Sequence, residues 1–201
     1  MNRMRGPLAS LNCDGRRGLA LAALCAFLLA LTLGGERLRG LLRYERAGLA
    51  AGQYWRLLTA HVIHLDLHHA LLNCGGLVLL WALFAGDYAP GQWLILLCAA
   101  ALAIDAGLWL GDSTVLWYVG SSGVLHGVMA AGALAGIRRR QPEGWLLAAI
   151  LLVKLLYEHY VGALPFSGRD PVVVDAHLYG VLGGCAAAAF LKPRPLYSRA
   201  T

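Results

Sequence analysis

Charged residues are scarce in this sequence of 201 residues. Asp, Glu, Lys and Arg make up 14% of it, whereas a typical soluble domain has about 25%. Hydrophobic residues make up 59%, above the usual share of about 45–50%. This composition excludes an ordinary soluble domain and indicates an integral membrane protein.

Cysteine is also sparse, and the five cysteines stand singly along the chain, at Cys13, Cys25, Cys74, Cys98 and Cys185. Four of them fall inside apolar runs, and the C-x-x-C spacing that is typical of metal ligands does not occur. We therefore expect them to pack as small hydrophobic side chains, and we expect no metal or other cofactor.

Long apolar runs, by contrast, recur along the whole chain. A membrane-spanning helix needs about 20 mostly apolar residues, and six such segments fit, at 18–34, 67–85, 92–110, 122–137, 145–163 and 174–191. We expect an all-α polytopic membrane protein with a single six-helix domain over 18–191. Residues 1–17 and 192–201 would then be cytoplasmic segments.

The net charge of +6 does not indicate a nucleic-acid partner, because Arg and Lys occur in short runs between apolar segments. The positive-inside rule accounts for such runs if both termini are cytoplasmic. The inner segments then hold Arg3, Arg5, Arg16, Arg17, Arg138, Arg139, Arg140, Lys192, Arg194 and Arg199. Opposing this orientation are the arginines of the first outer loop, Arg37, Arg39, Arg43, Arg46 and Arg56, partly offset by Glu36 and Glu45.

That first loop, residues 35–60, is the longest segment between two predicted spans and mixes Arg with Leu, Tyr and Trp. Trp and Arg commonly anchor protein segments at the membrane interface. We expect a structured loop that lies in this interface, although an ordinary interfacial linker has the same composition.

Small residues are concentrated in two of the predicted spans. Residues 122–137 contain four glycines and four alanines, and residues 174–191 contain three glycines followed by four alanines. Because small residues let membrane helices approach closely, these two helices should form the central packed pair.

Polar residues open three of the predicted spans, at 61–73, 120–127 and 175–184. A charged side chain at the centre of a membrane helix costs about 2.5–3.5 kcal/mol, so polar groups in spans are candidates for function. With both termini inside, all three groups lie just below the outer surface. Three polar clusters at one depth on three helices indicate a site.

The residue types in these clusters permit nucleophilic catalysis. A serine becomes a useful nucleophile when a histidine can accept its proton, and Ser122 and His177 supply such a pair. His69 and Asn73 are four residues apart, so both can point donors from one helix face at an oxyanion. Backbone N–H groups around Ser121 and Ser122, at a helix N-terminus, add further donors.

Two other interpretations of these residues stay open. Ser122 could simply be a helix N-cap, for which Ser121 is equally eligible. His61, His64 and His68 lie along one helix face and could bind a metal, with Asp66 nearby.

Four short motifs follow one another along the chain. They are W-R at Trp55 and Arg56, H-x4-H-x3-N at His64, His69 and Asn73, G-x-S-G at Gly120, Ser122 and Gly123, and A-H-x2-G-x3-G at Ala176, His177, Gly180 and Gly184. In this order and on these helices, they resemble the rhomboid family of intramembrane serine proteases.

The resemblance implies a six-helix core that cleaves membrane-embedded or membrane-proximal polypeptides. By it, Ser122 is the nucleophile, His177 the general base, His69 and Asn73 the oxyanion donors, and His64 a structural donor to the first loop. It also implies that water reaches the site from the outer face and that the 145–163 helix and the loop before the last span admit substrate laterally. The partners would be membrane-anchored proteins and the lipid bilayer, with the oligomeric state left open.

Within that family, the small size and the wording "GSSGVLHG" at 120–127 look most like the rhombosortase branch of Gram-negative bacteria. That branch acts on secreted proteins with a C-terminal tail that has a Gly-rich motif, one membrane helix and basic residues. The resemblance thus implies a multi-pass protein of the bacterial inner membrane whose site opens to the periplasm.

The chain departs from the family four residues after the serine, where many members have a Tyr that packs on the catalytic histidine and this chain has His126. Because His126 shares a helix face with Ser122, it is a rival base. We favour His177, because a partner on a neighbouring helix can meet the serine oxygen more directly.

Four further charged residues lie in or beside the predicted spans. Lys154 and Glu158 are one turn apart and can pair, which predicts a structural role, with gating as an alternative. Asp105 has no assigned partner, and Asp175 faces away from His177 and is not expected to complete a triad.

Two other functions compete with proteolysis. A rhomboid-like protein could hold membrane helices without cutting them, although the presence of both Ser122 and His177 argues against this. A histidine-rich metal or haem membrane protein is the other alternative, based on the cluster at 61–69.

Overall fold

Helices dominate the computed structural model, which describes residues 15–163 and 173–195, with side chains from residue 18 onward. One helix occupies each of the six apolar segments predicted above. These helices are α1 (Gly15–Leu33), α5 (Leu67–Phe84), α6 (Pro90–Ala106), α7 (Ser122–Arg138), α8 (Pro142–Val161) and α9 (Asp175–Phe190). A π-helical turn, Gly107–Gly111, continues α6.

By length and composition, three of the described helices can cross a membrane: α5 with 18 residues, Pro90–Gly111 with 22 and α8 with 20. A fourth span results if α1 and α2 (Gly35–Leu42), which meet at 108°, are taken as one bent span. The helices α7 and α9 are shorter, with 17 and 16 residues. Three or four of the six predicted spans therefore qualify by these two measures.

Local sequence fixes where several of these helices begin. Pro90 and Pro142 stand in the first turns of α6 and α8, where their missing N–H groups and fixed φ angles fit a helix start. Asp66 caps α5, because its carboxylate accepts a hydrogen bond from the backbone N–H of His69 at 2.7 Å.

The centre of the bundle is the contact between α7 and α9, which is the most extensive between any two described elements. A Cβ atom added at Gly123 would lie 2.7 Å from the Ala176 carbonyl oxygen, and one added at Gly127 would lie 2.6 Å from that of Gly180. A Cβ atom added at Gly184 would come closer still to the carbonyl oxygen of Gly127. The predicted close packing of the two small-residue helices is thus confirmed.

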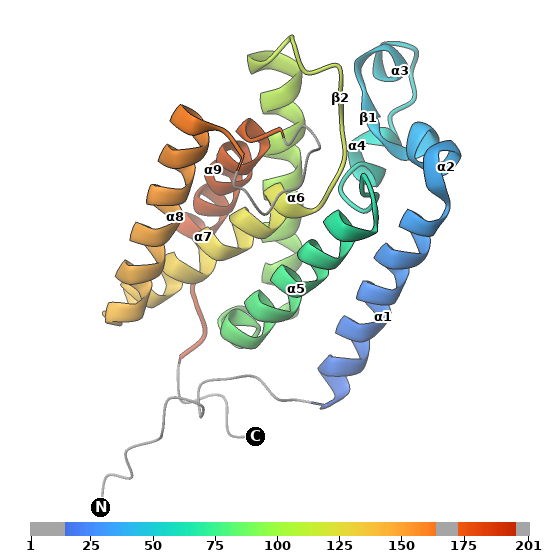
Figure 1. Ribbon diagram of the computed structural model, residues 1–201. Coiled ribbons are helices and arrows are strands. Elements are labelled where there is room, and N and C mark those ends of the chain that lie inside the picture. The colour runs from blue at the N-terminus through green and yellow to red at the C-terminus, as the bar shows by residue number, and fades with distance from the viewer. Residues whose placement is uncertain (1–14, 164–172, 196–201) are drawn as a thin grey trace, which may run out of the picture.

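The first loop is folded, as expected, and lies at one end of the bundle (Figure 1). It contains α2, β1 (Tyr44–Glu45), α3 (Arg46–Ala50) and α4 (Arg56–Thr59). β1 pairs antiparallel with β2 (Trp117–Tyr118), with Tyr44 opposite Tyr118. This pairing joins the first loop to the segment that leads into α7.

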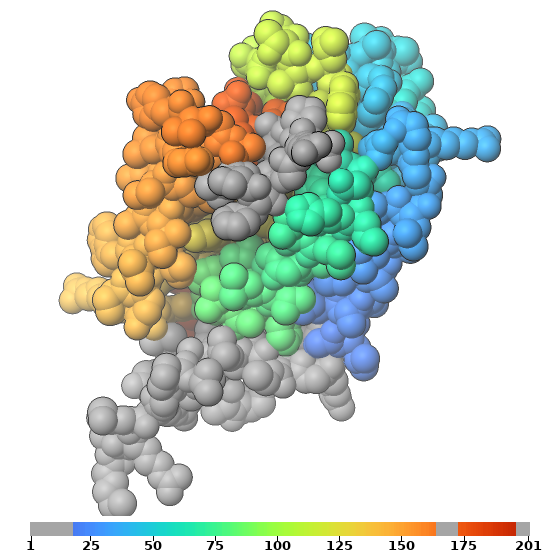
Figure 2. All heavy atoms as spheres, in the orientation of Figure 1, coloured from blue at the N-terminus to red at the C-terminus, as the bar shows by residue number. Residues whose placement is uncertain are grey.

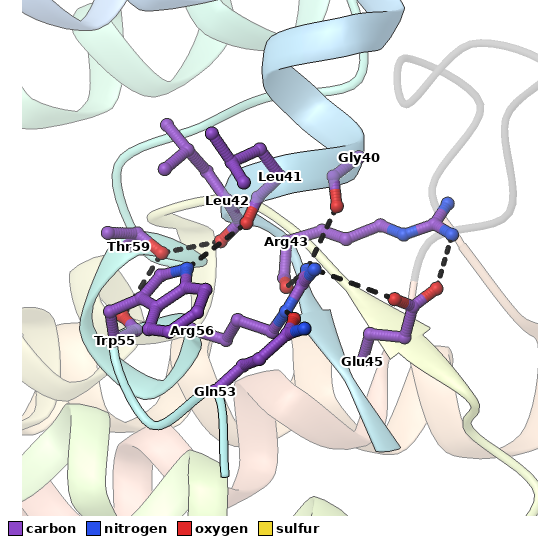
Figure 3. A network of polar contacts seen from close by, with 9 residues as sticks. All are labelled: Gly40, Leu41, Leu42, Arg43, Glu45, Gln53, Trp55, Arg56 and Thr59. Carbon is purple, nitrogen blue, oxygen red and sulfur yellow. Dashed lines mark hydrogen bonds and ion pairs between the residues drawn. The ribbon is translucent and has the colours of Figure 1, made fainter. Parts of the chain in front are cut away.

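Arg56 is the hub of that loop (Figure 3). Its buried guanidinium donates hydrogen bonds to the Gly40 carbonyl at 2.9 Å, the Arg43 carbonyl at 2.8 Å and the Gln53 side chain at 2.6 Å. Beside it, the Trp55 indole donates to the Leu41 carbonyl at 3.3 Å. The W-R motif therefore joins the end of α2 to the start of α4.

At the opposite end of the bundle, Arg138 closes the last turn of α9. Its guanidinium donates to the carbonyls of Ala188 at 2.7 Å, Ala189 at 2.6 Å and Leu191 at 2.7 Å. These are carbonyls that a helix end leaves without an intrahelical partner.

Next to it, Arg139 joins two turns and the chain beyond α9. Its guanidinium pairs with the Asp87 carboxylate at 2.8 Å and donates to the Arg194 carbonyl at 2.6 Å. Three arginines that the sequence places between or after apolar segments thus gather at one end of the bundle.

Candidate active site

The first turns of α5, α7 and α9 point toward the same end of the bundle (Figure 1). A cavity of about 340 Å³ lies between α5, α7, α8 and α9, and Figure 2 shows α7 recessed between α5 and α8 on this face. The polar residues that line it are His69, Asn73, Ser122, His126, Lys154, Glu158 and His177. The three polar clusters predicted from the sequence therefore meet at one place.

Gly120 sets the direction in which the chain enters α7. Its φ of 117° lies in a region that other residues rarely adopt. A Cβ atom at this position would also lie 2.8 Å from the His69 ring. Its N–H donates to the Ala60 carbonyl at 2.8 Å, and its own carbonyl accepts from the Tyr118 hydroxyl at 2.7 Å.

Ser122 is the first residue of α7, and its Oγ lies 3.0 Å from Nε2 of His177. His177 is buried in the first turns of α9. The distance is within hydrogen-bond range and depends on the close approach of the two helices at Gly123 and Gly180. The structure therefore brings together the serine and the histidine that the sequence paired.

Ser121, and not Ser122, occupies the N-cap position of α7, and its side chain makes no capping hydrogen bond, so the N-cap interpretation of Ser122 is wrong. Ser121 instead places its Oγ 3.2 Å from Nε2 of His64. Burial, together with the nearby His69, lowers the pKa of His64 to about 4, so this imidazole is neutral at pH 7. The expectation that His64 binds the first loop is corrected: its side-chain partner is Ser121.

His126 lies on the Ser122 face of α7, as expected, but its contacts differ from those of a base for Ser122. Its Nδ1 lies 2.7 Å from the Ser122 carbonyl oxygen, which can only accept a hydrogen bond. Its ring is stacked on that of His177, with centroids 4.1 Å apart and planes at 19°. His126 thus binds the backbone of the serine and packs on the histidine.

His69 and Asn73 both line the cavity beside Ser122. The Asn73 amide nitrogen donates one hydrogen bond to the His69 carbonyl at 3.0 Å. An amide nitrogen carries two hydrogens, so a second donor remains available to the cavity. The predicted convergence of these two side chains with the serine is therefore seen in the structure.

Sequence reasoning missed the partner of His177 on its other side. Oε2 of Glu158 lies 2.9 Å from Nδ1 of His177, and Oε1 of the same carboxylate lies 2.5 Å from Nζ of Lys154. The expected Lys154–Glu158 pair exists, but the Glu158 carboxylate also contacts His177 in the site. The only signal in the sequence was an acidic residue within an apolar run.

The histidines at 61–68 do not gather around one point. The ring of His61 is buried with Nε2 3.3 Å from the Asp105 carboxylate, which supplies the partner that Asp105 lacked in the sequence analysis. His64 contacts Ser121, and His68 is exposed. Among the described residues, the trio whose ligand atoms lie close enough to hold a metal is instead His126, Glu158 and His177. Within this trio, both ring nitrogens of His177, Oε2 of Glu158 and Nδ1 of His126 are already engaged in hydrogen bonds to one another or to Ser122.

Comparison with known proteins places these features in a family. A family model described as "Rhomboid domain" matches residues 51–194, a range that contains every site residue named above. The chain is 26% identical over 180 residues to "Rhomboid protease GluP" of Bacillus subtilis (strain 168), an alignment that covers 86% of this chain and 34% of the relative. It is 20% identical over 137 residues to "Putative rhomboid protease YdcA" of the same organism, covering 68% of this chain and 67% of the relative. The chain thus spans about a third of the length of GluP.

Proposed function

Because this chain belongs to the rhomboid family, we propose that it is an intramembrane serine protease in which Ser122 is the nucleophile and His177 the general base. The observation that carries the proposal is the 3.0 Å contact between Ser122 Oγ and His177 Nε2 inside a cavity between helices. Both its family and its protease relatives support intramembrane peptide hydrolysis.

The reaction follows from this geometry. The Ser122 oxygen attacks the scissile carbonyl while its proton passes to Nε2 of His177. The same proton then goes to the leaving amine, and a water repeats the sequence on the acyl-enzyme. No cofactor takes part in these steps.

The negative oxygen of the tetrahedral intermediate needs donors aimed at it. His69 and Asn73 line the cavity next to Ser122. The backbone N–H groups at Ser121 and Ser122 lie at the N-terminus of α7, where the helix dipole favours negative charge. Removing one such donor typically lowers the rate about 100- to 1000-fold.

Substrate would reach the serine from within the membrane. Apart from its polar site residues, the 340 Å³ cavity is lined mainly by apolar side chains of α5 and α7, among them Leu72, Leu79, Leu125 and Met129. These suit a membrane-embedded segment. We assign the lateral gate to α8 and the loop before α9, most of which, 164–172, lies outside the described residues.

Water would arrive from the other side. A second cavity, of about 260 Å³, shares Leu65, His69 and Ser122 with the first and is otherwise lined by residues 114–119, which include β2, and by Val173. It therefore lies toward the end of the bundle that carries the first loop.

The proposed topology has six spans with both termini in the cytoplasm. The helices α5, α7 and α9 then start at the outer side, with the site, and the arginines at the α7–α8 turn lie at the inner side, as the positive-inside rule requires. In a Gram-negative bacterium this is a multi-pass inner-membrane protein whose site opens to the periplasm.

For the substrate class we propose a rhombosortase activity on secreted proteins with a Gly-Gly C-terminal sorting tail, because "GSSGVLHG" resembles that branch. The test is to graft a Gly-Gly element onto an unrelated single-span reporter, with a second reporter in which both glycines are leucine. Processing of the first reporter alone supports the assignment. Equal processing of both, or of neither, contradicts it.

A fluorophosphonate serine probe tests the activity itself on protein purified in detergent. We expect labelling of the wild type and of His126→Ala, and loss of labelling in Ser122→Ala and His177→Ala. A well-folded wild type that is not labelled would contradict the proposal and favour a catalytically silent protein that binds membrane helices.

A further inference from the structure

We propose that Glu158 is a positioning residue that, with Ser122 and His177, forms a Ser–His–Glu triad, and that Lys154 holds its carboxylate in place. This inference rests on the protease function proposed above and adds a third member, from α8, to the serine and histidine supplied by α7 and α9.

The geometry is a continuous chain of polar contacts across three helices. Ser122 Oγ lies 3.0 Å from Nε2 of His177, and Nδ1 of the same ring lies 2.9 Å from Oε2 of Glu158. Both the histidine and the glutamate are buried, with 5% and 4% of their surface exposed. Their contact is therefore shielded from water, which strengthens a charge-assisted hydrogen bond.

This contact decides which nitrogen of His177 carries the proton. An ionised carboxylate can only accept hydrogen bonds, so Nδ1 must be the protonated nitrogen. Nε2 is then left with its lone pair, which is what a base for Ser122 requires. Without Glu158 the other tautomer becomes available, and it cannot accept the serine proton.

Glu158 also faces the charge that develops during the reaction. When the Ser122 O–H bond breaks and the oxygen bonds to the carbonyl carbon, the proton forms a new bond to Nε2 and the ring becomes positive. The carboxylate stabilises that imidazolium without taking the proton from Nδ1.

Lys154 lowers the free-energy cost of burying the Glu158 carboxylate. Its ammonium lies one turn before Glu158 on α8, and Nζ is 2.5 Å from Oε1. A buried ion needs a partner and hydrogen bonds on its remaining atoms. With Oε1 on Lys154 and Oε2 on His177, both oxygens of Glu158 are engaged.

The other polar groups around His177 do not hold its Nδ1 as Glu158 does. His126 of α7 stacks on the face of the ring and binds the Ser122 carbonyl. Asp175 lies two residues before His177 in the first turn of the same helix, and Nδ1 of His177 contacts Glu158.

The first test compares Glu158→Gln with Glu143→Gln, which makes the same chemical change at an exposed position of the same helix. We expect the fluorophosphonate labelling rate, and kcat on a cleaved reporter, to fall by up to about 10,000-fold in Glu158→Gln, the loss seen when a triad aspartate is changed to asparagine. KM should change little, and Glu143→Gln should match the wild type. A Glu158→Gln protein that is labelled at the wild-type rate overturns the proposal.

A second measurement needs no variant of Glu158 and no activity. In protein with 15N-labelled histidine, the His177 ring, assigned by its absence in His177→Gln, should show a protonated Nδ1 and an unprotonated Nε2 at neutral pH. The opposite tautomer overturns the proposal. If the wild type is never labelled by the probe, the protease function fails, and this spectrum still decides whether Glu158 fixes the histidine.

Lys154→Met separates the two parts of the proposal if Glu158→Gln does not fold. We expect it to keep the Nδ1–H tautomer of His177 while lowering the labelling rate by less than Glu158→Gln does. Loss of that tautomer in Lys154→Met would contradict the assigned order, in which Glu158 acts on the histidine and Lys154 on the glutamate.

Discussion

The rings of His126 and His177 are stacked, with their centroids 4.1 Å apart and their planes at 19°. Hydrogen-bond contacts with Ser122 and Glu158 hold the two ring nitrogens of His177. The His126 ring, stacked on one face of His177, further limits the rotation of the His177 ring. His126 stands four residues after the serine, where many rhomboids have a tyrosine. Like that tyrosine, it packs on the catalytic histidine.

This packing predicts a modest effect of His126→Ala on activity. An aromatic pair contributes about 0.5–1.5 kcal/mol beyond its buried area, so we expect the fluorophosphonate labelling rate to fall about 2- to 10-fold. His126→Tyr, which restores an aromatic ring, should recover most of the rate. Loss of labelling as complete as in Ser122→Ala would instead identify His126 as the base.

The two neighbouring serines should separate function from structure. Ser122→Ala is expected to abolish labelling with little change in thermal stability in detergent. Ser121→Ala should be labelled but less stable by about 1 kcal/mol, because the buried His64 nitrogen loses its partner. If Ser121→Ala is the unlabelled variant, the two roles have been assigned the wrong way round.

The central glycines predict a stability difference between matched substitutions. Gly127→Ala introduces a Cβ atom 2.6 Å from the Gly180 carbonyl oxygen, and we expect a loss of about 1–3 kcal/mol from overpacking. Gly75→Ala in α5 meets nothing within 4 Å and should be neutral or stabilising, since alanine favours a helix more than glycine does. Thermal unfolding in one detergent compares the two, and equal melting temperatures would contradict close packing of α7 on α9.

His64 predicts that the protein loses stability in mild acid. Its pKa is lowered to about 4 in the folded state by burial and by His69, whereas an unfolded histidine titrates near its usual value of about 6.5. The stability that depends on neutral His64 is thus fully present above about pH 6.5. As the pH falls from there toward about 4, the unfolded histidine binds a proton that the folded one does not, and this stability is lost. At about pH 5 the loss should be about 2 kcal/mol.

The control for this pH effect is the exposed His68. Melting temperatures at pH 7.5 and pH 5 should converge in His64→Gln, which cannot take up a proton, while His68→Gln should keep the wild-type difference. A wild-type difference that persists unchanged in His64→Gln would assign the acid sensitivity to other groups.

Sequence reasoning located the helices and the Ser122–His177 pair because both depend on local patterns. Apolar runs mark the helices, and glycines at a one-turn spacing mark the faces of α7 and α9 that meet. The partners Glu158 of His177 and Asp105 of His61 were missed because each lies on another helix, at a depth that depends on how the helices pack. The four-residue spacing of Lys154 and Glu158 even suggested that their charges were satisfied within α8.

The number of membrane spans is the other feature that local sequence patterns could not settle. The six predicted spans include α7 and α9, although their 17 and 16 residues fall short of the rule of about 20 residues. Their contact with each other, which removes both from full exposure to lipid, is a tertiary property.

The guanidinium of Arg138, which binds the last carbonyls of α9, has a consequence for the surrounding lipid. At 1.5 Å per residue, a helix of 16 residues is about 24 Å long, shorter than the bilayer hydrocarbon of about 30 Å. In the proposed six-span topology, a helix end with unsatisfied carbonyls could not stop at that depth, and the three hydrogen bonds from Arg138 would let α9 end there. Under that topology, lipid next to α9 would face a hydrophobic mismatch, which a bilayer relieves by thinning.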